Sequence, residues 1–329
     1  MIWVKFALSA AAIVLTATQL AKFGDVIAIR TRLGGMFIGV LLMAGATSLP
    51  EVLTSFNAIR INTPNLAAGD LLGSNNMNMV LLAIIDMVTL NQRILRKAAL
   101  KHALTGSLAV FMIGLVLFFM LADIDIKLGW VGLDGLLIIA FYIISVRIIQ
   151  SNADHGSDSG QMMEMEEGFP SLRSGIIGFA IAAGALVVIT PIMVQSANEI
   201  AALTGLGTSF IGTTLVALTT SLPEAVTTLA AIKIGANDMA IGNLFGSNMF
   251  NMFVIGLNDV IFTQGRFLAE VDPSLMLVGA IGILMTGMGL IGNLAKLEKR
   301  IWFIEIDALA LLLLFFGSLW LLYIRGVAH

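Results

Sequence analysis

The chain has 329 residues, of which 58% are hydrophobic and only 12% are charged, with a mean hydropathy of +0.97. This composition is far too apolar for a soluble domain of that length and favours an integral membrane protein. The absence of Cys excludes a disulfide framework and a thiolate site, and the net charge of −3 argues against nucleic acid as a partner.

Apolar runs of roughly 20 residues predict transmembrane helices along the whole chain. The first run follows Met1 almost directly, without a basic leader or a clear cleavage site, so we expect a retained span rather than a signal peptide. The ten predicted spans are residues 3–21, 36–59, 66–90, 103–121, 129–149, 174–196, 209–232, 238–262, 274–292 and 303–324.

One strongly polar stretch separates the fifth and sixth predicted spans. Residues 151–172 are acidic and rich in Gly and Ser, so we expect a solvated linker between a five-helix unit at 1–150 and another at 173–329. The loops after the odd-numbered spans carry 13 of the 18 Lys and Arg residues. By the positive-inside rule, this predicts a cytoplasmic linker, both termini outside, and a place in the plasma (inner) membrane.

The two halves of the chain are related by an internal duplication. Residues 37–86 align with 210–259 without a gap at an offset of 173, and about 23 of those 50 positions are identical. Each half holds five spans, an odd number, so the second copy must cross the membrane upside down relative to the first. The predicted fold is therefore all-α and integral to the membrane, with ten transmembrane helices as two inverted-topology five-helix repeats. Transporters of this kind bind substrate near the midplane, between the repeats.

Polar segments inside the apolar spans are the best-matched parts of the duplication. GATSLPE at 45–51 pairs with LTTSLPE at 218–224, and GDLLGSNNMN at 69–78 pairs with GNLFGSNMFN at 242–251. Helical spacing of three and four residues places hydroxyl and amide oxygens on the same face as a carboxylate or as one another. The candidate oxygen ligands are Thr47, Ser48, Glu51, Ser74 and Asn78 in the first copy, and Thr220, Ser221, Glu224, Ser247 and Asn251 in the second.

The two carboxylates need a proton or a cation as compensation. A charge at the bilayer centre costs on the order of 2.5–3.5 kcal/mol, and no Lys, Arg or His lies in the central part of any other span to pair with Glu51 and Glu224. Mid-span Pro50 and Pro223 cannot donate to the carbonyls four residues back, which frees further oxygens. Such hard ligands suit Ca2+, although several monovalent ions or Mg2+ remain open, and the His and Cys ligands of Zn2+ or Cu sites are missing.

These paired segments resemble the two alpha-repeats of the cation/Ca2+ antiporter superfamily, and in particular its sodium/calcium exchanger family. The resemblance implies antiport of Ca2+ against Na+, cation binding by the ten residues named above, and a contribution of the Ala44 and Ala217 carbonyls to Na+ sites. It also implies that spans 1 and 6 slide against the others. In the proton/calcium branch of the superfamily, the segment around the glutamate resembles G-N-x-x-E, and this chain does not have that motif. Many relatives carry Asp where Asn251 stands, which leaves the ion count open and argues against K+ co-transport.

Other function classes explain fewer of these features. A cation channel could use the same acidic residues, but a single-chain inverted repeat with an oxygen cage fits binding and occlusion better. An intramembrane enzyme needs a nucleophile with a base or a metal held by His, and the three histidines lie in loops or at the terminus. We therefore expect no enzyme activity, no cofactor and no obligate protein partner, and coupling to H+ instead of Na+ stays open. Asp259 and Asp134 match Asp86 and Asp307 near span ends, where helix-end roles are expected.

Overall fold

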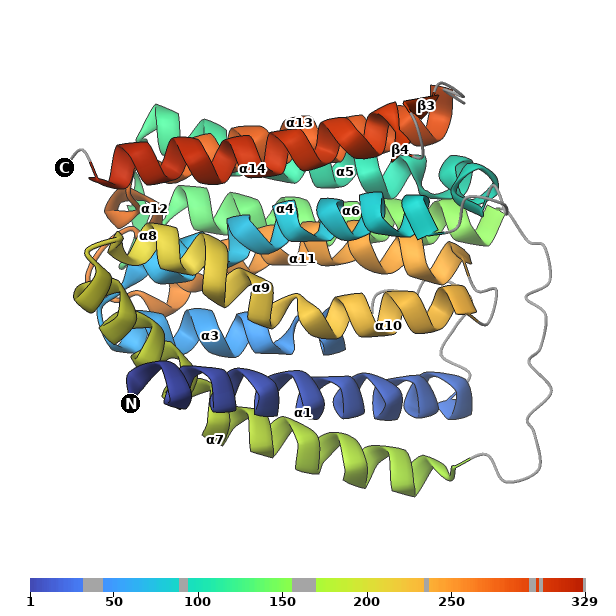
Figure 1. The fold of residues 1–329 in the computed structure, drawn as a ribbon, viewed down its shortest axis with the longest axis horizontal. Helices are drawn as coiled ribbons and strands as arrows, with labels where there is room; N and C mark the ends of the chain where they lie inside the picture. The colour runs from blue at the N-terminus through green and yellow to red at the C-terminus, as the bar shows by residue number, and fades with distance from the viewer. Residues whose placement is uncertain are drawn as a thin grey trace.

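The structure is a bundle of long helices (Figure 1). The computed structural model describes residues 1–31, 44–88, 94–155, 170–233, 237–295, 300–301 and 304–327. Within these residues the first half holds α1 (Ile2–Thr31), α3 (Leu49–Arg60), α4 (Pro64–Val88), α5 (Ile94–Ala122), β1 (Lys127–Leu128), β2 (Val131–Gly132) and α6 (Leu133–His155).

The second half begins with α7 (Leu172–Thr204) and continues through one interrupted helical segment. That segment comprises α8 (Gly207–Ile211), the π-helical turn η1 (Gly212–Val216), α9 (Ala217–Thr220) and α10 (Leu222–Lys233). It is followed by α11 (Asn237–Ile261), α12 (Phe267–Glu270), α13 (Leu275–Ala295), β3 (Arg300–Ile301), β4 (Ile304–Glu305) and α14 (Ile306–Val327). β1 pairs with β2, and β3 with β4, as two short antiparallel ribbons.

Six helices in the described part of the chain are long and apolar enough to cross a membrane. Helices satisfy every backbone N–H and C=O internally, which is the condition for spanning lipid. The remaining predicted spans coincide with helices that are shorter, rich in polar residues or only partly described. The six candidates are Ile2–Thr31, His102–Ala122, Leu133–Asn152, Leu172–Thr204, Gly207–Lys233 and Met239–Ile261.

The distribution of side chains is inverted relative to a soluble protein. Large apolar residues are exposed along the outer helices, including Leu15 on α1, Phe118 on α5, Ile181 on α7 and Phe316 on α14. The interior instead holds many buried hydroxyl, amide and carboxylate groups. Because a large exposed apolar surface requires an apolar partner, this arrangement is that of a protein embedded in lipid.

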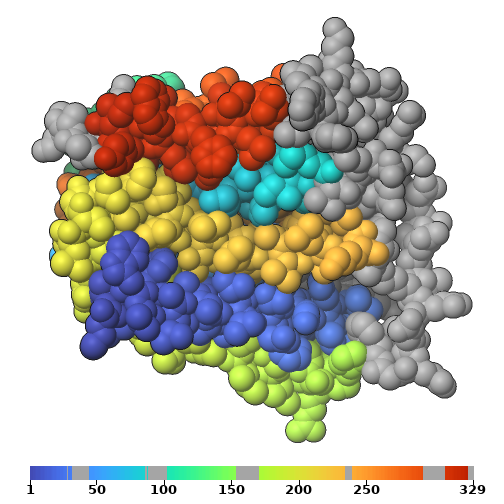
Figure 2. Space-filling view, viewed as in Figure 1, coloured from blue at the N-terminus to red at the C-terminus, as the bar shows by residue number. Residues whose placement is uncertain are grey.

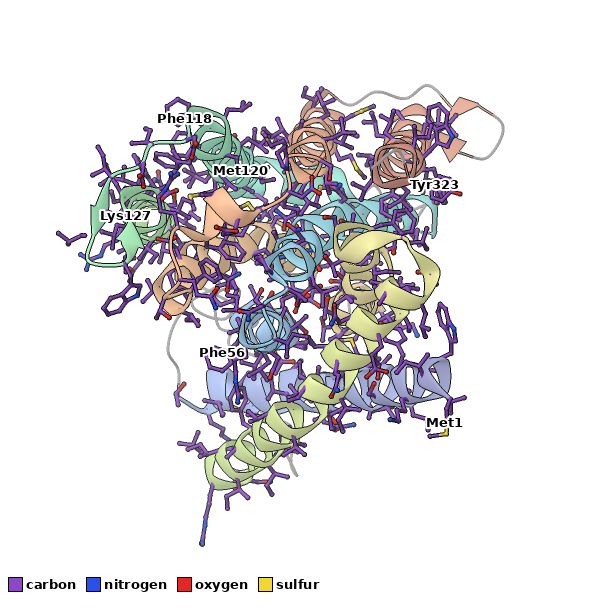
Figure 3. The ribbon with its side chains drawn as sticks, turned by 90° about the vertical axis from the view of Figure 1, so that its left-hand side faces the viewer. Met1, Phe56, Phe118, Met120, Lys127 and Tyr323 are labelled. Atoms are coloured by element: carbon purple, nitrogen blue, oxygen red, sulfur yellow. The ribbon has the colours of Figure 1, made fainter. Side chains whose placement is uncertain are left out.

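α1 and α7 lie together along one edge of the bundle (Figures 1 and 3). They approach closely because a Cβ at Gly178 would overlap the ring of Phe23, and one at Gly175 would lie 3.3 Å from the Cβ of Val26. Figure 2 shows α14, the segment from α8 to α10, α1 and α7 following one another across the viewed face. Of the six candidate spans, α11 is the most deeply buried.

Both ends of the chain lie at the same end of the bundle, where α1 begins and α14 ends (Figure 1). Exposed aromatic residues gather at this end, with Trp3 at the start of α1 and Trp320 and Tyr323 near the end of α14. Trp and Tyr prefer the membrane–water interface, because their rings are apolar and carry one polar group. We infer that one interface lies at this level.

A buried ion pair closes the same end of the bundle. Arg266 contacts Asp134 at 3.0 Å and Asp123 at 2.9 Å. Asp259 accepts the backbone N–H groups of Gly132 and Phe267 at 2.6 and 2.7 Å. The predicted helix-end roles of Asp134 and Asp259 are confirmed, whereas the side chains of their counterparts at 86 and 307 lie outside the described residues.

Several predicted boundaries differ from the observed ones. α1 continues to Thr31, ten residues beyond the predicted end of its span, and α6 continues through 151–155, which were expected to begin the linker. The linker residues 156–169 lie outside the described residues, as do 32–43 at the start of the second predicted span. The seventh predicted span, 209–232, is not one helix but four successive helical pieces.

Candidate functional site

Two interrupted helices carry the glutamates. Residues 44–47 are helical, Ser48 is a turn, and α3 begins at Leu49; α9 likewise ends at Thr220, with Ser221 between it and α10. Proline lacks an N–H, so Pro50 and Pro223 weaken the helix at these points. Glu51 and Glu224 therefore lie in the first turns of α3 and α10. The positive end of each helix dipole faces its own carboxylate and partly stabilises it.

The two glutamates are brought into one buried site. Each is only 1% exposed. The hydroxyl of Ser48 donates to Oε1 of Glu224 at 3.2 Å, which links the first break to the second carboxylate. The like charges of Glu51 and Glu224 repel each other within this site. Oε2 of each glutamate has no hydrogen-bond partner among the described residues.

The carbonyls of Ala44 and Ala217 lie one helical turn before the two breaks. Each accepts the backbone N–H four residues further on, at 2.9 and 3.0 Å respectively. Each also lies within hydrogen-bond distance of a threonine hydroxyl, that of Thr47 at 3.2 Å and that of Thr220 at 3.3 Å. A carbonyl oxygen has two lone pairs, and a hydroxyl has only one hydrogen to donate. When the threonine hydrogen points elsewhere, the second lone pair of the carbonyl is available to a cation.

The same threonine hydroxyls also reach across to α4 and α11. Thr220 donates to Oδ1 of Asp70 at 2.8 Å and lies 3.3 Å from the hydroxyl of Ser74. Thr47 makes the matching contact to Oδ1 of Asn243 at 3.4 Å. Thr47 and Thr220 are 173 positions apart, as are Asp70 and Asn243, so the same contact is made twice with the roles of the two halves exchanged.

Four asparagines join α4 to α11 in the same reciprocal way. The Nδ2 of Asn75 donates to the backbone carbonyl of Asn248 at 3.3 Å, and the Nδ2 of Asn248 donates to that of Asn75 at 3.4 Å. Asn78 donates to Oδ1 of Asn248 at 2.9 Å, and Asn251 donates to Oδ1 of Asn75 at 3.0 Å. These bonds use the N–H groups of Asn78 and Asn251 and leave their Oδ1 atoms without a partner among the described residues.

Glycines bring α4 into backbone contact with the interrupted segment. A Cβ at Gly73 would lie 2.7 Å from the carbonyl oxygen of Thr213, and a Cβ at Gly212 would lie 2.7 Å from that of Leu66. Real Cβ atoms essentially never approach so closely. Small residues at these crossings therefore set the distance between Ser74 and Thr220.

The site is a buried set of oxygens that could accept more hydrogen bonds than the surrounding groups donate to them. Burying a polar atom without a partner is costly, so a concentration of such atoms is informative. The described residues hold no cluster of three or more His, Cys, Asp or Glu side chains arranged as metal ligands, so a bound cation would also depend on hydroxyl and amide oxygens. The site oxygens without a hydrogen-bond partner among the described residues are Glu51 Oε2, Asp70 Oδ2, Asn78 Oδ1, Ser221 Oγ, Glu224 Oε2, Ser247 Oγ and Asn251 Oδ1.

All twelve residues predicted from the sequence are at least 98% buried. Hydrogen bonds join Ser48 to Glu224 and Ser74 to Thr220, whereas Ser221 Oγ and Ser247 Oγ lack partners among the described residues. The prediction overlooked Asp70, Asn75, Asn243 and Asn248. Both of the overlooked pairs stand at the offset of 173 within the quoted segments, and Asp70 is a charge within a predicted span, so the signal was present.

Comparison with known proteins places the chain in a family. The family described as sodium/calcium exchanger protein matches residues 1–149 and 174–324, which is nearly the whole chain. The inner membrane protein YrbG of Escherichia coli (strain K12) is 29% identical over 249 residues, which are 72% of this chain and 71% of YrbG.

Solved exchangers share the fold. A structure of the sodium-calcium exchanger NCX_Mj superposes with a TM-score of 0.58 at 23% identity, covering 97% of this chain and 98% of that one. The H+/Ca2+ exchanger CAX gives a TM-score of 0.69 at 14% identity, covering 99% and 85%. Identities this low establish the fold alone. Together with the family match over the whole chain, they identify this protein as a member of the sodium/calcium exchanger family of membrane antiporters, which are transporters and not enzymes.

Proposed function

We propose that this protein exchanges Ca2+ for Na+ by alternating access to a site formed around Glu51 and Glu224. The observation that carries the proposal is the buried set of unpartnered oxygens around these two carboxylates. Ca2+ takes 6–8 oxygen ligands, which this set supplies in kind and in number. The sodium-calcium exchanger NCX_Mj, which shares the fold, supports the same assignment.

The proposed architecture is ten spans in two inverted repeats, residues 1–150 and 173–329, joined by the linker at 151–172. The reciprocal contacts between positions 173 apart support it, because two copies related by a two-fold axis in the membrane plane make each contact twice. The excess of Lys and Arg in the odd-numbered loops supports a cytoplasmic linker with both termini outside, and we propose a plasma or inner membrane as the location.

Two kinds of ligand serve the two ions. Ca2+ binds the glutamates together with the serine hydroxyls and the free amide oxygens of Asn78 and Asn251. Na+ binds the hydroxyls of Thr47 and Thr220 together with the carbonyls of Ala44 and Ala217. The single hydroxyl hydrogen of each threonine can then point to Asp70 Oδ1 or Asn243 Oδ1, which leaves a lone pair of the hydroxyl oxygen for the cation. Because the two ligand sets overlap at the glutamates, both ions cannot be bound fully at once.

The exchange of ions follows from electrostatics. Two uncompensated carboxylates in a closed, dry site are costly, so the protein changes the side it faces only when cations are bound. One ion therefore leaves only when another takes its place. The expectation of transported Ca2+ and Na+ as bound ions, without a cofactor or protein partner, belongs to this same proposal.

In this mechanism α1 and α7 move together along the rest of the bundle. The chain has no native Cys, so disulfides can test the motion cleanly. A Cβ at Gly24 on α1 would lie 3.5 Å from the Cβ of Ala46, close to the spacing of a disulfide. Gly24→Cys with Ala46→Cys should stop exchange until it is reduced. Val26→Cys with Gly175→Cys, which ties α1 to α7, should leave exchange intact; equal inhibition by both pairs would contradict the motion.

The transport test is 45Ca2+ uptake into proteoliposomes under an imposed Na+ gradient. Glu51→Gln and Glu224→Gln each remove a charge from the site and should reduce uptake roughly 10- to 100-fold, the range expected for one charged interaction. Glu270→Gln, an exposed residue of α12, is the matched control and should transport normally. Full uptake in both site variants would refute the site, and single-channel current steps from the purified protein would indicate a channel.

Coupling to H+ is the second candidate, because the H+/Ca2+ exchanger CAX superposes with the higher TM-score of the two solved exchangers. The same vesicles decide between them. A pH gradient without Na+ should drive no uptake if Na+ is the coupling ion. Uptake that responds to the pH gradient and ignores Na+ would overturn the sodium assignment while keeping the site.

A further inference from the structure

A third carboxylate lies in the site beside the two glutamates. Asp70 is completely buried on α4, and its Oδ1 accepts the hydroxyl of Thr220 at 2.8 Å. Its Oδ2 has no partner among the described residues, and none of the ion pairs found there involves it. Asp70 is close enough to interact electrostatically with both Glu51 and Glu224.

The matching position in the second half of the chain is neutral. Asn243 stands 173 residues after Asp70, and its Oδ1 faces the hydroxyl of Thr47 at 3.4 Å. Its Nδ2 lies 3.5 Å from the hydroxyl of Thr227 and 3.3 Å from that of Thr228. Both the oxygen and the nitrogen of the Asn243 amide therefore have hydrogen-bond partners. The second half of the chain shows that an uncharged residue can occupy this position with its hydrogen bonds made.

Aspartate at position 70 makes no such bonds in the first half. The counterparts of the two acceptor threonines are Thr54 and Ser55. Ser55 accepts the Nδ2 of Asn258 at 3.3 Å instead, whereas the hydroxyl of Thr54 is buried and without a partner among the described residues. Asparagine at 70 could donate to these hydroxyls, whereas a carboxylate has no hydrogen to give. A buried charge with an unpartnered oxygen weakens the fold, so stability does not explain Asp70.

A row of side-chain oxygens on α4 leads away from Asp70. Asp70, Ser74 and Asn78 are spaced four residues apart and share one face of the helix. The Oδ2 of Asp70 and the Oδ1 of Asn78 both lack partners among the described residues. The described residues hold no three-acid metal cluster, which favours a neighbouring position for Asp70 over a place around the ion held by both glutamates.

We propose that Asp70 is a third carboxylate ligand of the transported cations, present in the first half of the chain only, and that it holds one additional monovalent cation such as Na+. This inference rests on the proposed function, because it concerns the same site. Its consequence is a site with one more negative charge than the two glutamates supply, and with unequal halves. The neutral asparagines at 78 and 251 do not provide that charge.

Asp70→Asn is the direct test, because it removes the charge but keeps the shape and the acceptor for Thr220. Equilibrium 45Ca2+ binding to the purified full-length protein, with Na+ as competitor, gives an affinity and a Hill coefficient. In Asp70→Asn we expect Na+ to displace Ca2+ with a Hill coefficient lower by about one and an at least tenfold weaker apparent affinity for Na+. Combining Asp70→Asn with Asn243→Asp returns a carboxylate to the matching position and should restore part of both.

The outcomes separate cleanly. An unchanged Hill coefficient and Na+ affinity in Asp70→Asn would overturn the inference. The inference would also be overturned if cation-free Asp70→Asn melted at a much lower temperature than the cation-free wild type and if adding Asn243→Asp did not restore that temperature. Asp70 would then have a structural role. If wild-type vesicles move no Ca2+ under either gradient, the proposed function fails. Loss of one bound Na+ in Asp70→Asn would still support the role of Asp70, since binding is measured without transport.

Discussion

Replacing Gly73 by Ala is expected to push α4 away from the segment that carries Thr220. The new Cβ would lie 2.7 Å from the carbonyl oxygen of Thr213, and 2.8 Å from both the Cα of Thr213 and the Cβ of Ala217. Two of these three atoms belong to the backbone, so a change of rotamer cannot relieve the overlap. Ordinary contact begins at 3.4 Å, so the two elements must separate by about 0.7 Å.

The shift acts on stability and on the site together. Overpacking of this kind costs about 1–3 kcal/mol in the free energy of unfolding. The same shift lengthens the 2.8 Å bond between Asp70 and Thr220 to about 3.5 Å, at the limit of a hydrogen bond, and moves Ser74 to about 4 Å from Thr220. Because Ca2+ keeps its oxygens within about 2.3–2.6 Å, we expect loss of at least one ligand and a roughly tenfold or greater fall in affinity.

Thermal melts and 45Ca2+ binding of the purified Gly73→Ala protein measure both effects. Gly114→Ala on α5 is the matched control, because its Cβ would meet only Ile283 Cδ1 at an ordinary 3.8 Å. The control should bind Ca2+ normally and melt at or slightly above the wild-type temperature, since Ala favours a helix over Gly. Wild-type affinity and melting temperature in Gly73→Ala would refute the claim that this glycine sets the geometry of the site.

Three further substitutions test separate parts of the structure. Arg266→Leu leaves buried Asp134 without its cation, so the free energy of unfolding should fall by about 3–5 kcal/mol in thermal melts, and adding Asp134→Asn should recover most of it; no recovery would contradict the ion pair. Ser247→Ala removes a hydroxyl without a partner among the described residues, so 45Ca2+ affinity should fall roughly 5- to 30-fold while the melting temperature holds, whereas the opposite pattern would assign Ser247 to packing. Asn248→Ala breaks the reciprocal bonds with Asn75 and should lower both the melting temperature and the Ca2+ affinity; a change in neither would show that this pair does not hold the site together.

The duplicated sequence predicts much of the site, because matching positions of two inverted copies are expected to meet in the folded protein. In the proposed inverted repeat, residues that match at the offset of 173 face each other across the repeat axis, so identical polar positions in both copies predict one shared cluster. Glu51 and Glu224 follow from this reasoning, and the contact from Ser48 to Glu224 agrees with it. Burial of the whole set also follows, since polar groups in apolar spans face the protein interior.

Other features depend on the backbone rather than on the pattern. Pro50 and Pro223 indicate breaks, but the helices are interrupted at Ser48 and Ser221, two residues earlier. The proline ring crowds the preceding turn, and its missing N–H cannot bond to the carbonyl four residues back, so the disruption lies before the proline itself. The π-helical turn at Gly212–Val216 has no distinct sequence signature. The turn is apparent only from the structure, in which its Gly212 lies against the backbone of α4.

Asp70 shows the limit of reasoning from matched residues. Because the alignment pairs it with Asn243, the position resembles ordinary divergence between two copies, and the identical residues around it attract more attention. The structure draws attention to the difference instead. The amide of Asn243 makes hydrogen bonds, whereas Oδ2 of Asp70 has no partner among the described residues, so Asp70 is the unusual residue of the pair.

An inverted repeat by itself would present equal binding surfaces to the two sides of the membrane. If Asp70 binds a cation as we propose, a charge present in one half only makes the ions on the two sides of the repeat axis inequivalent, because the extra Coulomb attraction holds the cation beside Asp70 more strongly. That attraction acts only when an ion is present, and the buried carboxylate is costly when it is not. Asp70 therefore strengthens the condition that prevents an empty carrier from crossing, and it does so at the expense of the stability that asparagine would have provided at the same place.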